Sequence, residues 1–161
     1  MRAATALKES TIRFEDPVRS LLSKKRALTV WSIGPEASVY QAIETMSERQ
    51  VGALIVTSGG RLLGIVTERD YARKVILKGR VSQDTRVREI MTAPVLFVSP
   101  DESLDDCMRM MTSRRVRYLP VMEGDDVVGI ISIGDVVDWM ISSQEQTIHH
   151  LQNYIAGAYP G

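Results

Sequence analysis

The sequence contains two segments in which an apolar run ends in a hydroxyl residue that is followed three positions later by an aspartate. GIVTERD contains Thr67 and Asp70, and GIISIGD contains Ser132 and Asp135. Each segment should form a buried strand that leads into a helix, so the helix starts at the carboxyl end of a strand, where α/β folds commonly bind ligands. Free backbone N–H groups and the helix dipole favour a phosphate there, and an aspartate one turn in can accept hydrogen bonds from both hydroxyls of a ribose. The pattern therefore favours a sugar phosphate as ligand.

The same spacing has a simpler explanation. A hydroxyl followed by an acid or amide three residues later is a capping box, which satisfies the first backbone N–H groups of a helix without any ligand. Two further pairs, Ser38 with Gln41 and Ser103 with Asp106, have this form at other expected helix starts. Four boxes cannot all be ligand sites, so capping alone stays an open interpretation of the two pairs described above.

Basic residues follow the first pair on its expected helix, and others lie beside the strand VRYLPV of the second half. They can neutralise a phosphate, or they can form a solvated helix face, and for any single residue both interpretations stay open. The group consists of Arg69, Arg73, Lys74, Lys78 and Arg80 in the first half and Arg114, Arg115 and Arg117 in the second. Taken together, these residues strengthen the phosphate interpretation.

Both segments belong to an internal repeat with an offset of about 65 residues. The matching pairs include Pro35 and Pro100, Met46 and Met111, Val51 and Val116, Leu54 and Leu119, Gly64 and Gly129, and Asp70 and Asp135. The helical periodicity repeats as well. One apolar face comprises Val39, Ala42, Ile43 and Met46, and its counterpart comprises Leu104, Cys107, Met108 and Met111; later, Tyr71, Ala72, Val75 and Ile76 correspond to Val136, Val137, Met140 and Ile141. The lead-in PVRSLL resembles RVREIM, so each half begins with a short helix.

Each half contains two apolar runs of strand length separated by a turn signal. The runs are residues 51–56 and 62–66 in the first half, and VRYLPV and VVGII in the second. Because they are continuous rather than alternating, the strands should be buried on both faces. Pro120 cannot donate to a sheet ladder, which places it at an edge or an irregular end of its strand. The expected order in each repeat is strand, helix, strand, strand, helix.

These elements define the expected fold. The 161 residues are 44% apolar, which suits one domain, whereas a half of about 60 residues can bury only a modest core. We therefore expect an α/β (α+β) fold in which two βαββα repeats pack sheet to sheet around a pseudo-twofold axis. The expected divisions are an N-terminal extension (1–16), repeat 1 with its leading helix (17–80), repeat 2 with its leading helix (81–146), and a helix end and tail (147–161) in which AGAYPG breaks the helical pattern.

The two segments, each preceded by a strand of the form Val-x-x-Leu-x-Val, resemble the cystathionine-β-synthase (CBS) domain, which occurs in tandem pairs. The likeness extends from about Pro17 to Ile141 and includes TERDYARKVILKGR, VREIMT, RVRYLPV and ISIGDVV. In these motifs the chain is similar to small stand-alone CBS-pair proteins. The resemblance implies a single Bateman-type module that binds an adenosine compound such as AMP, ADP, ATP or NAD(H), and that joins a second copy as a disc-shaped homodimer.

The resemblance also implies roles for particular residues. Asp70 and Asp135 would hold ribose, Thr67 and Ser132 would lie near phosphate, and Arg69 and Arg117 would neutralise its charge. The adenine would lie against the backbone of Ile33 and Val98 and against Ala53, Tyr118 and Pro120, with Gly134 at the second helix start. The first repeat has Gly52 and Ile55 where the second has Arg117 and Pro120. We therefore expect the Asp135 site to be the better formed.

Composition limits the other classes of function. Twenty basic and twenty acidic residues leave no net charge, so neither nucleic acid nor an anionic membrane is an expected partner. No apolar run approaches the length of a membrane span, and the start lacks the apolar centre of a signal peptide. The single cysteine, Cys107, suits a cytoplasmic protein, with an organelle matrix as the alternative in a eukaryote. His149 and His150 are adjacent and lie on different helix faces, so no metal site is expected.

Three hypotheses for function follow. The leading one is a non-enzymatic regulatory module that senses adenosine nucleotides and acts through a homodimer on an unidentified protein. The second is an enzyme in which an aspartate acts as general base, although the sequence offers no nucleophile with a base, no P-loop and no metal cluster. The third is a protein-interaction or dimerisation module whose clefts are degenerate and bind nothing.

Overall fold

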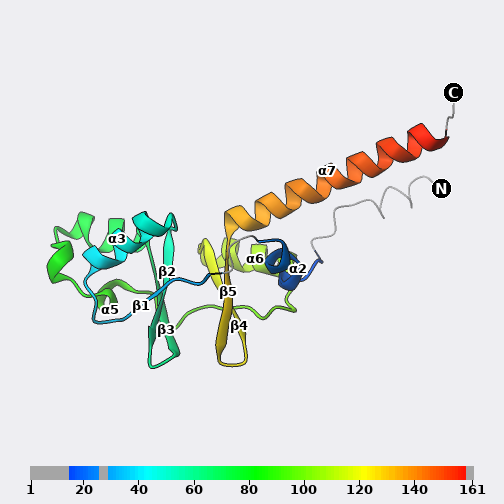
Figure 1. The fold of residues 1–161 in the computed structure, drawn as a ribbon. Helices are drawn as coiled ribbons and strands as arrows, with labels where there is room; N and C mark the ends of the chain where they lie inside the picture. Colours follow the sequence, from blue (N-terminus) through cyan, green and yellow to red (C-terminus); the bar gives the residue numbers. More distant parts are fainter. Residues whose placement is uncertain (1–14, 26–28, 159–161) are drawn as a thin grey trace.

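The computed structural model describes residues 15–25 and 29–158 and shows two lobes side by side, one for each repeat (Figure 1). The first lobe contains β1 (Ser32–Ile33), α3 (Val39–Arg49), β2 (Ala53–Ser58), β3 (Arg61–Thr67), α4 (Glu68–Lys74) and the short 3-10 turns η1 (Ile76–Lys78) and η2 (Ser82–Asp84). The second contains α6 (Leu104–Arg114), β4 (Tyr118–Glu123), β5 (Asp126–Ser132) and α7 (Ile133–Ala158). Two short helices, α2 (Val18–Lys24) and α5 (Val87–Ile90), precede the repeats.

Local chemistry explains where these elements begin and end. Ser38 and Ser103 each accept a hydrogen bond from a backbone N–H of the helix they precede, as expected for caps. Both helices then end on a residue in the left-handed region, Gln50 and Arg115, with φ of 55° and 54°. These two residues are 65 positions apart, so the repeat extends to backbone conformation.

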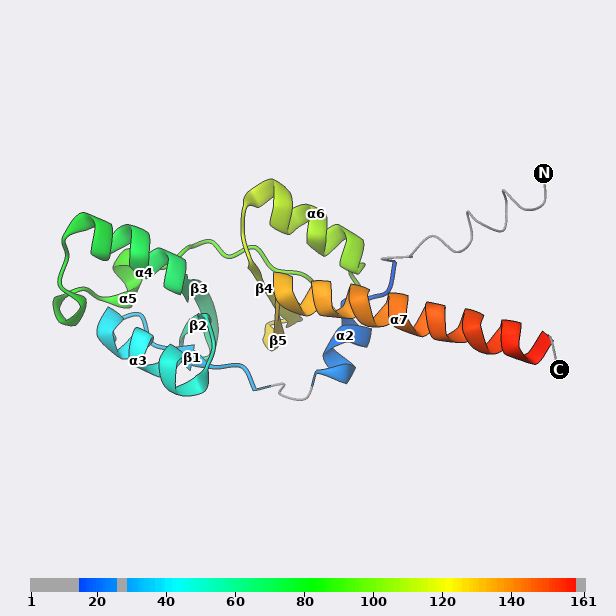
Figure 2. The same cartoon turned by 90° about the horizontal axis from the view of Figure 1, so that it is seen from above.

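The two sheets face each other between outer layers of helices. β1, β2 and β3 form one sheet, with β1 parallel to β2 and β2 antiparallel to β3; β4 and β5 form the other. A central cluster of Ala53, Ile55 and Ile65 packs against Tyr118, Val127 and Ile130 of the opposite sheet. Figure 2 shows the helices on the far sides, α3, α4 and α5 on one lobe and α2, α6 and α7 on the other. The predicted sheet-to-sheet arrangement of two repeats is thus confirmed.

Each repeat also has a core of its own between sheet and helices. The faces predicted from helical spacing are buried there: Val39, Ala42 and Met46 in one core, and Leu104, Cys107 and Met111 in the other. Because β2 and β3 contact helices on one face and the second sheet on the other, residues 53–56 and 64–66 are all buried. This double burial is the physical reason for the continuous apolar runs.

The two leading helices cross over between the repeats. Val18, Leu21 and Leu22 of α2 lie in the core of the second repeat, whereas Val87 and Ile90 of α5 lie in the core of the first. By packing, therefore, each short helix belongs to the repeat that it does not precede in sequence.

Equivalent backbone hydrogen bonds fix the two crossings. The N–H of Val18 donates to the carbonyl of Glu102 at 2.8 Å, and that of Val87 donates to Ala37 at 2.9 Å. Gly129 and Gly64 allow the close approach, because a Cβ at Gly129 would lie 2.8 Å from Leu22 and one at Gly64 would lie 2.9 Å from Met91. The crossing therefore obeys the same pseudo-twofold relation as the sheets.

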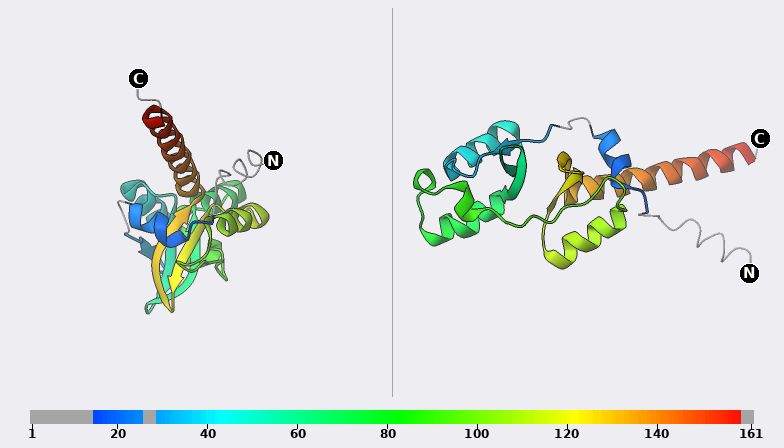
Figure 3. Two further views of the ribbon diagram at one scale, coloured as in Figure 1. Left: turned by 90° about the vertical axis from the view of Figure 1, so that its right-hand side faces the viewer. Right: turned by 90° about the horizontal axis from the view of Figure 1, so that it is seen from below.

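Some elements differ from expectation. The first strand of the second repeat is reduced to a single bridge between Val98 and Val121. Pro120 lies inside β4 rather than at its end, but in a two-stranded sheet it is on an edge strand, and its carbonyl accepts from Val98 at 3.0 Å. α7 extends into the segment AGAYPG as far as Ala158, the last described residue, and leaves the body as a single helix (Figures 1 and 3). Within the described ranges, no helix has the length and apolar character needed to cross a membrane.

Candidate functional site

The two aspartate motifs lie where a strand from each sheet passes directly into a helix. Thr67 ends β3 and caps α4, and Ser132 ends β5 and precedes α7. In both, the aspartate N–H donates to the hydroxyl, and the aspartate carboxylate accepts from the backbone N–H of the hydroxyl residue. The capping box is therefore present at both junctions, and the remaining question is what space and charge surround it.

A cavity of about 420 Å³ lies beside Ser132 and Asp135. We call it the Asp135 cleft. It lies between the repeats, because its walls come from both sheets and from the chain that leads into β1. The lining residues are Lys25, Thr29, Trp31, Arg49, Gln50, Val51, Gly52, Ala53, Tyr118, Ile130, Ser132 and Asp135. The Arg49 guanidinium stacks on the Trp31 ring at 4.0 Å from its centroid, which combines an aromatic wall with a positive charge.

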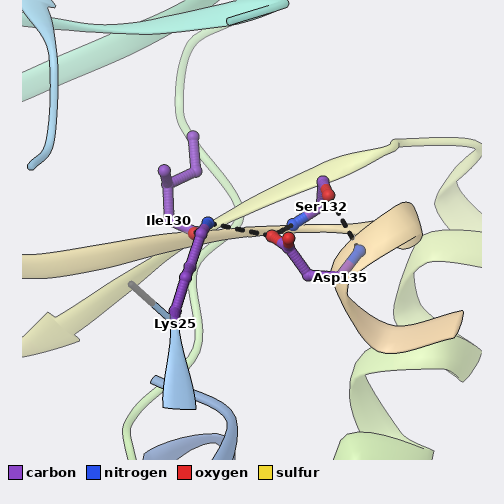
Figure 4. A network of polar contacts seen from close by, with 4 residues as sticks. All are labelled: Lys25, Ile130, Ser132 and Asp135. Carbon is purple, nitrogen blue, oxygen red and sulfur yellow. Dashed lines mark hydrogen bonds and ion pairs between the residues drawn. The ribbon is translucent and has the colours of Figure 1, made fainter. Parts of the chain in front are cut away.

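Lys25 holds the Asp135 carboxylate (Figure 4). Its Nζ donates to Asp135 Oδ2 at 2.9 Å and to the carbonyl of Ile130 at 2.8 Å. The Ser132 N–H donates to the same Oδ2 at 2.8 Å. Among the described residues, none donates to Oδ1, so one oxygen of this carboxylate still has an open acceptor position.

The Asp70 junction has the equivalent arrangement in a smaller space. We call the adjoining cavity, of about 200 Å³, the Asp70 cleft. It is lined by Ile65, Thr67, Arg69, Asp70, Arg73, Lys74, Thr92, Arg115, Val116 and Tyr118. Here Thr67 donates to Oδ2 through its N–H and its hydroxyl, and Lys74 Nζ lies 3.0 Å from Oδ1. Both oxygens of Asp70 are therefore occupied.

The lysines that neutralise the two aspartates come from different elements. Lys74 is one turn beyond Asp70 on α4, whereas the position one turn beyond Asp135 holds Trp139. Lys25, which follows α2, replaces the missing helix lysine. Comparison of the two repeats did not identify Lys25. The match between PVRSLL and RVREIM ends at Leu22, and four extra residues then separate this segment from the first strand.

A third cavity, of about 290 Å³, lies between the two clefts and shares residues with each. We call it the arginine cavity; it is lined by Gly52, Thr67, Glu68, Arg69, Arg73, Arg117 and Tyr118. The lining contains three arginines and only one acidic residue, Glu68. Arg69 donates to the carbonyl of Arg115 at 3.2 Å, while Arg73 and Arg117 make no ion pair with any described residue. The cavity therefore has a positive balance of charge suited to phosphate.

Tyr118 is the one residue that lines all three of these cavities. It corresponds to Ala53 in the first repeat, so a large ring faces a small side chain across the pseudo-twofold axis. Burial, followed by the nearby Glu68 carboxylate, raises the pKa of the Tyr118 phenol, and Arg117 opposes this effect. The phenol is therefore a neutral hydrogen-bond donor at neutral pH.

The structure brings most of the predicted site residues together. The Asp135 cleft contains Ala53, Tyr118, Ser132 and Asp135; the Asp70 cleft and the arginine cavity contain Thr67, Arg69, Asp70, Arg117 and Tyr118. Ile33, Val98, Pro120 and Gly134 do not line these cavities. Val98 and Pro120 are buried in the second repeat, and Gly134 is exposed on α7.

Other lining residues were not predicted from sequence. Thr29 and Trp31 form the wall that was expected at Ile33, and Lys25 and Arg49 supply charge. The only signal for Trp31 was its place two positions before Ile33, on the same side of an extended chain. In the described part of the chain, no group of three or more His, Cys, Asp or Glu side chains is arranged to hold a metal ion.

The fold and the paired clefts define a module of two structural repeats, and comparison with known proteins agrees. Residues 18–77 and 87–142 match the family model described as the CBS domain. The chain therefore belongs to the CBS-domain family, with two CBS repeats in one Bateman-type module. This confirms the resemblance inferred from its motifs.

Individual relatives extend the comparison. The chain is 39% identical over 127 residues to the mitochondrial CBS domain-containing protein CBSX3 of Arabidopsis thaliana; the match covers 76% of this chain and 62% of that protein. A solved structure from Burkholderia ambifaria, whose name proposes a signal-transduction protein with CBS domains, has a TM-score of 0.78 at 47% identity over 80% of this chain and 96% of that one. A hexameric CBS-CP12 protein from bloom-forming cyanobacteria has a TM-score of 0.70 at 26% identity, covering 89% of this chain and 87% of that one. These names describe CBS-domain proteins without stating a catalytic activity.

Proposed function

We propose that this CBS pair is a regulatory module that binds an adenosine nucleotide (AMP, ADP, ATP or NAD(H)) and relays its occupancy through a homodimer to a partner protein. The observation that carries the proposal is the Asp135 cleft. Its volume of about 420 Å³ lies within the range of small-molecule pockets, roughly 300–1,000 Å³. It combines an apolar and aromatic wall with a carboxylate, a helix start and nearby guanidinium groups, which are the groups needed for base, ribose and phosphate.

Each part of the ligand has a matching group. A ribose hydroxyl can donate to the open Oδ1 of Asp135, while Lys25 stays on Oδ2 and keeps the carboxylate charged. The base can lie against Trp31 and Tyr118, and the phosphates can extend past Gly52 to Arg73 and Arg117. The Asp70 cleft would be the weaker site, because it is smaller and both oxygens of Asp70 are occupied.

Binding in this module would be regulatory rather than catalytic. The groups around Asp135 satisfy one another by capping and ion pairing, and no nucleophile with an adjacent base lies in the described clefts. Since each cleft has walls from both repeats, a ligand that prefers one relative position of the repeats would shift the module toward it. The hexameric CBS-CP12 neighbour supports self-association as the route of relay. The compartment, cytoplasm or organelle matrix, stays a prediction.

A second candidate is a protein-interaction or dimerisation module with degenerate clefts. The specific observation in its favour is that lysines already neutralise both aspartates, Lys25 at Asp135 and Lys74 at Asp70. A carboxylate that is stabilised inside the protein does not require a ligand.

Calorimetric titration with AMP, ADP, ATP and NADH distinguishes the two candidates. We expect binding, with the Asp135→Asn variant weaker by about 10- to 100-fold, because a hydrogen bond to a charged group contributes roughly 1.5–3 kcal/mol. Ser132 still accepts from the N–H of residue 135, and the asparagine side-chain oxygen can still accept from the Ser132 N–H, so the fold should be retained. Asp70→Asn is the matched control and should change the stronger binding step by less than about threefold. No heat and no shift in melting temperature at millimolar ligand would reject nucleotide binding, and recovery of chemically altered nucleotide would reject a purely regulatory role.

A further inference from the structure

Helix α7 presents an apolar stripe that stays exposed in the described part of the structure. The helix begins on the second repeat, where Val136 is fully buried and Trp139 and Met140 pack against the core. It then runs away from both lobes toward the C-terminus (Figures 1 and 2). Beyond that anchored start the helix extends by about 1.5 Å per residue with no other described element beside it.

Exposed side chains on this helix follow a seven-residue pattern. Val137, Ile141, Gln144, Ile148 and Leu151 are separated by four, three, four and three residues in turn, which is the spacing of a and d positions in a coiled coil. The apolar members have exposed fractions of 39%, 49%, 55% and 54%. Ile155 occupies the next position of the same register in the sequence. We call this set the α7 seam.

From this pattern we infer that the α7 seam is a dimer interface and that its partner is the α7 of a second copy of this chain, packed parallel to it. The inference does not rest on nucleotide binding, since the seam contains no residue of the clefts.

The polar member of the seam favours self-pairing. A glutamine amide carries both donor and acceptor groups, so Gln144 can pair with Gln144 of an identical helix directly opposite, which happens only when the two helices are parallel and in register. In an antiparallel pair, or against a different apolar helix, this amide would face a side chain that cannot bond to it. A single polar residue in such a seam selects register at some cost in stability.

The charge of α7 also favours an identical helix as the partner. No lysine or arginine follows Arg117 in the sequence, and α7 carries acidic residues only at positions 135, 138 and 145. Such a helix lacks the basic face that binds an anionic membrane and the charged flanks that select an oppositely charged partner. Hydrophobic burial is the main attraction that the seam offers, and an identical seam satisfies it.

The α7 seam is short, so the packing of the start of α7 against the second repeat matters for its stability. Fewer than three heptads are short for an isolated coiled coil, which usually needs three to four. Here the first turns of α7 are already folded against the second repeat through Val136, Trp139 and Met140, so part of the entropy cost of forming the helix is offset before association.

The first test compares molar mass for the full chain at micromolar concentration by light scattering. Ile148→Asp/Leu151→Asp places charges in the seam, and we expect the mass of the assembly to fall by half. His149→Asp is the matched control, because His149 is exposed and outside the seam register, and it should leave the mass unchanged. A wild-type chain that is monomeric, including one that instead binds anionic vesicles, overturns the inference. An assembly whose mass survives the seam variant while circular dichroism shows an intact helix also overturns it.

A second test fixes the orientation. Ile148→Cys places a thiol in the seam, and Asn153→Cys places one on an exposed position outside it. Under mild oxidation we expect a disulfide-linked dimer from the first and little from the second. The native Cys107 is fully buried and should not contribute. Dimers at both positions, or at neither, contradict a parallel seam.

Discussion

Gly52 lies so close to Tyr118 that a Cβ at position 52 would overlap the phenol oxygen. The repeat places Gly52 opposite Arg117 and Ala53 opposite Tyr118, so the two halves differ where they meet near the pseudo-twofold axis. The first repeat has no side chain at this point, and the second fills the space with a ring that lines the Asp135 cleft, the Asp70 cleft and the arginine cavity. The asymmetry between the clefts therefore has a steric origin.

Gly52→Ala should lower the free energy of unfolding by about 1–3 kcal/mol, the usual cost of overpacking. The overlap is with the phenol oxygen, so Tyr118→Phe in the same chain should restore most of the loss. Urea unfolding of the two single variants and the double variant gives the coupling between the sites. Gly34→Ala is the control, because nothing lies within 4 Å of a Cβ there. Equal losses with and without the Tyr118 hydroxyl would show that the glycine is needed for another reason.

The Lys25 to Asp135 ion pair should contribute measurably to stability. The two side chains are only 28% and 25% exposed, and Lys25 also bonds the Ile130 carbonyl. We expect Lys25→Met to lower the free energy of unfolding by about 1 kcal/mol, and added salt to reduce the difference from wild type. Lys78→Met is the control, since Lys78 is exposed and has no ion pair in the described structure. A Lys25 variant as stable as the control would mean that the pair adds nothing.

The fold could be predicted from the sequence because the same apolar pattern occurs in two copies, and each copy supports the interpretation of the other. The spacing of Val39, Ala42 and Met46 recurs in Leu104, Cys107 and Met111, and all six are buried. The tandem architecture follows once two copies are recognised, since neither half can bury both faces of its strands alone. The crossing of α2 and α5 was not accessible, because PVRSLL and RVREIM show that a helix exists without showing which core it enters. That choice depends on the tertiary contacts of Leu22 and Met91 with Gly129 and Gly64.

The candidate site was predicted in part for a similar reason. The two hydroxyl and aspartate pairs are short motifs within a single segment, so they recur in both repeats and can be recognised by comparing them. They are Thr67 with Asp70 and Ser132 with Asp135. Lys25 and Trp31 reach the cleft from the segment before β1, where the two halves differ, so comparison of the halves gave no signal for them. Arg49 ends α3 as Arg114 ends α6, so for this residue the repeat did contain a signal. The predicted apolar face of the second helix in each repeat was also too wide. Ile76, Val137 and Ile141 are exposed, so part of each predicted apolar face lies outside the cores.

Arg117 should discriminate between nucleotides by their number of phosphates. It lines the arginine cavity and has no ion pair with a described residue, so its guanidinium is available to a ligand. Arg117→Gln should weaken ATP binding by about tenfold while changing adenosine binding by less than twofold, because charge-assisted hydrogen bonds to phosphate are lost and the sugar contacts remain. Calorimetry with both ligands measures the difference. Arg61→Gln, on the exposed β2–β3 hairpin, is the control. Parallel losses for ATP and adenosine would place the phosphates elsewhere.

The Cys107 thiol should be unreactive toward thiol reagents in the folded protein. It lies on the buried face of α6, and burial, with the nearby Glu102 and Asp106 carboxylates, raises the pKa of its thiol from 9.0 to about 11. A thiol reagent applied near pH 8 should therefore react with the unfolded chain and hardly at all with the native one. Rapid labelling of native protein would show that α6 opens readily or that the thiol is accessible.

The same shift makes stability depend on alkaline pH. Below pH 9 the thiol is protonated in both states, and its contribution to folding is fully present; between pH 9 and about 11 the unfolded chain loses the proton while the folded chain retains it, so stability falls as pH rises. Cys107→Ala removes this dependence, and alanine should be tolerated because Ala42 occupies the equivalent place in α3. Urea midpoints at several values across this interval should decline more steeply for the wild type than for the variant. Identical slopes would mean that other groups control the alkaline behaviour and that burial of the thiol does not.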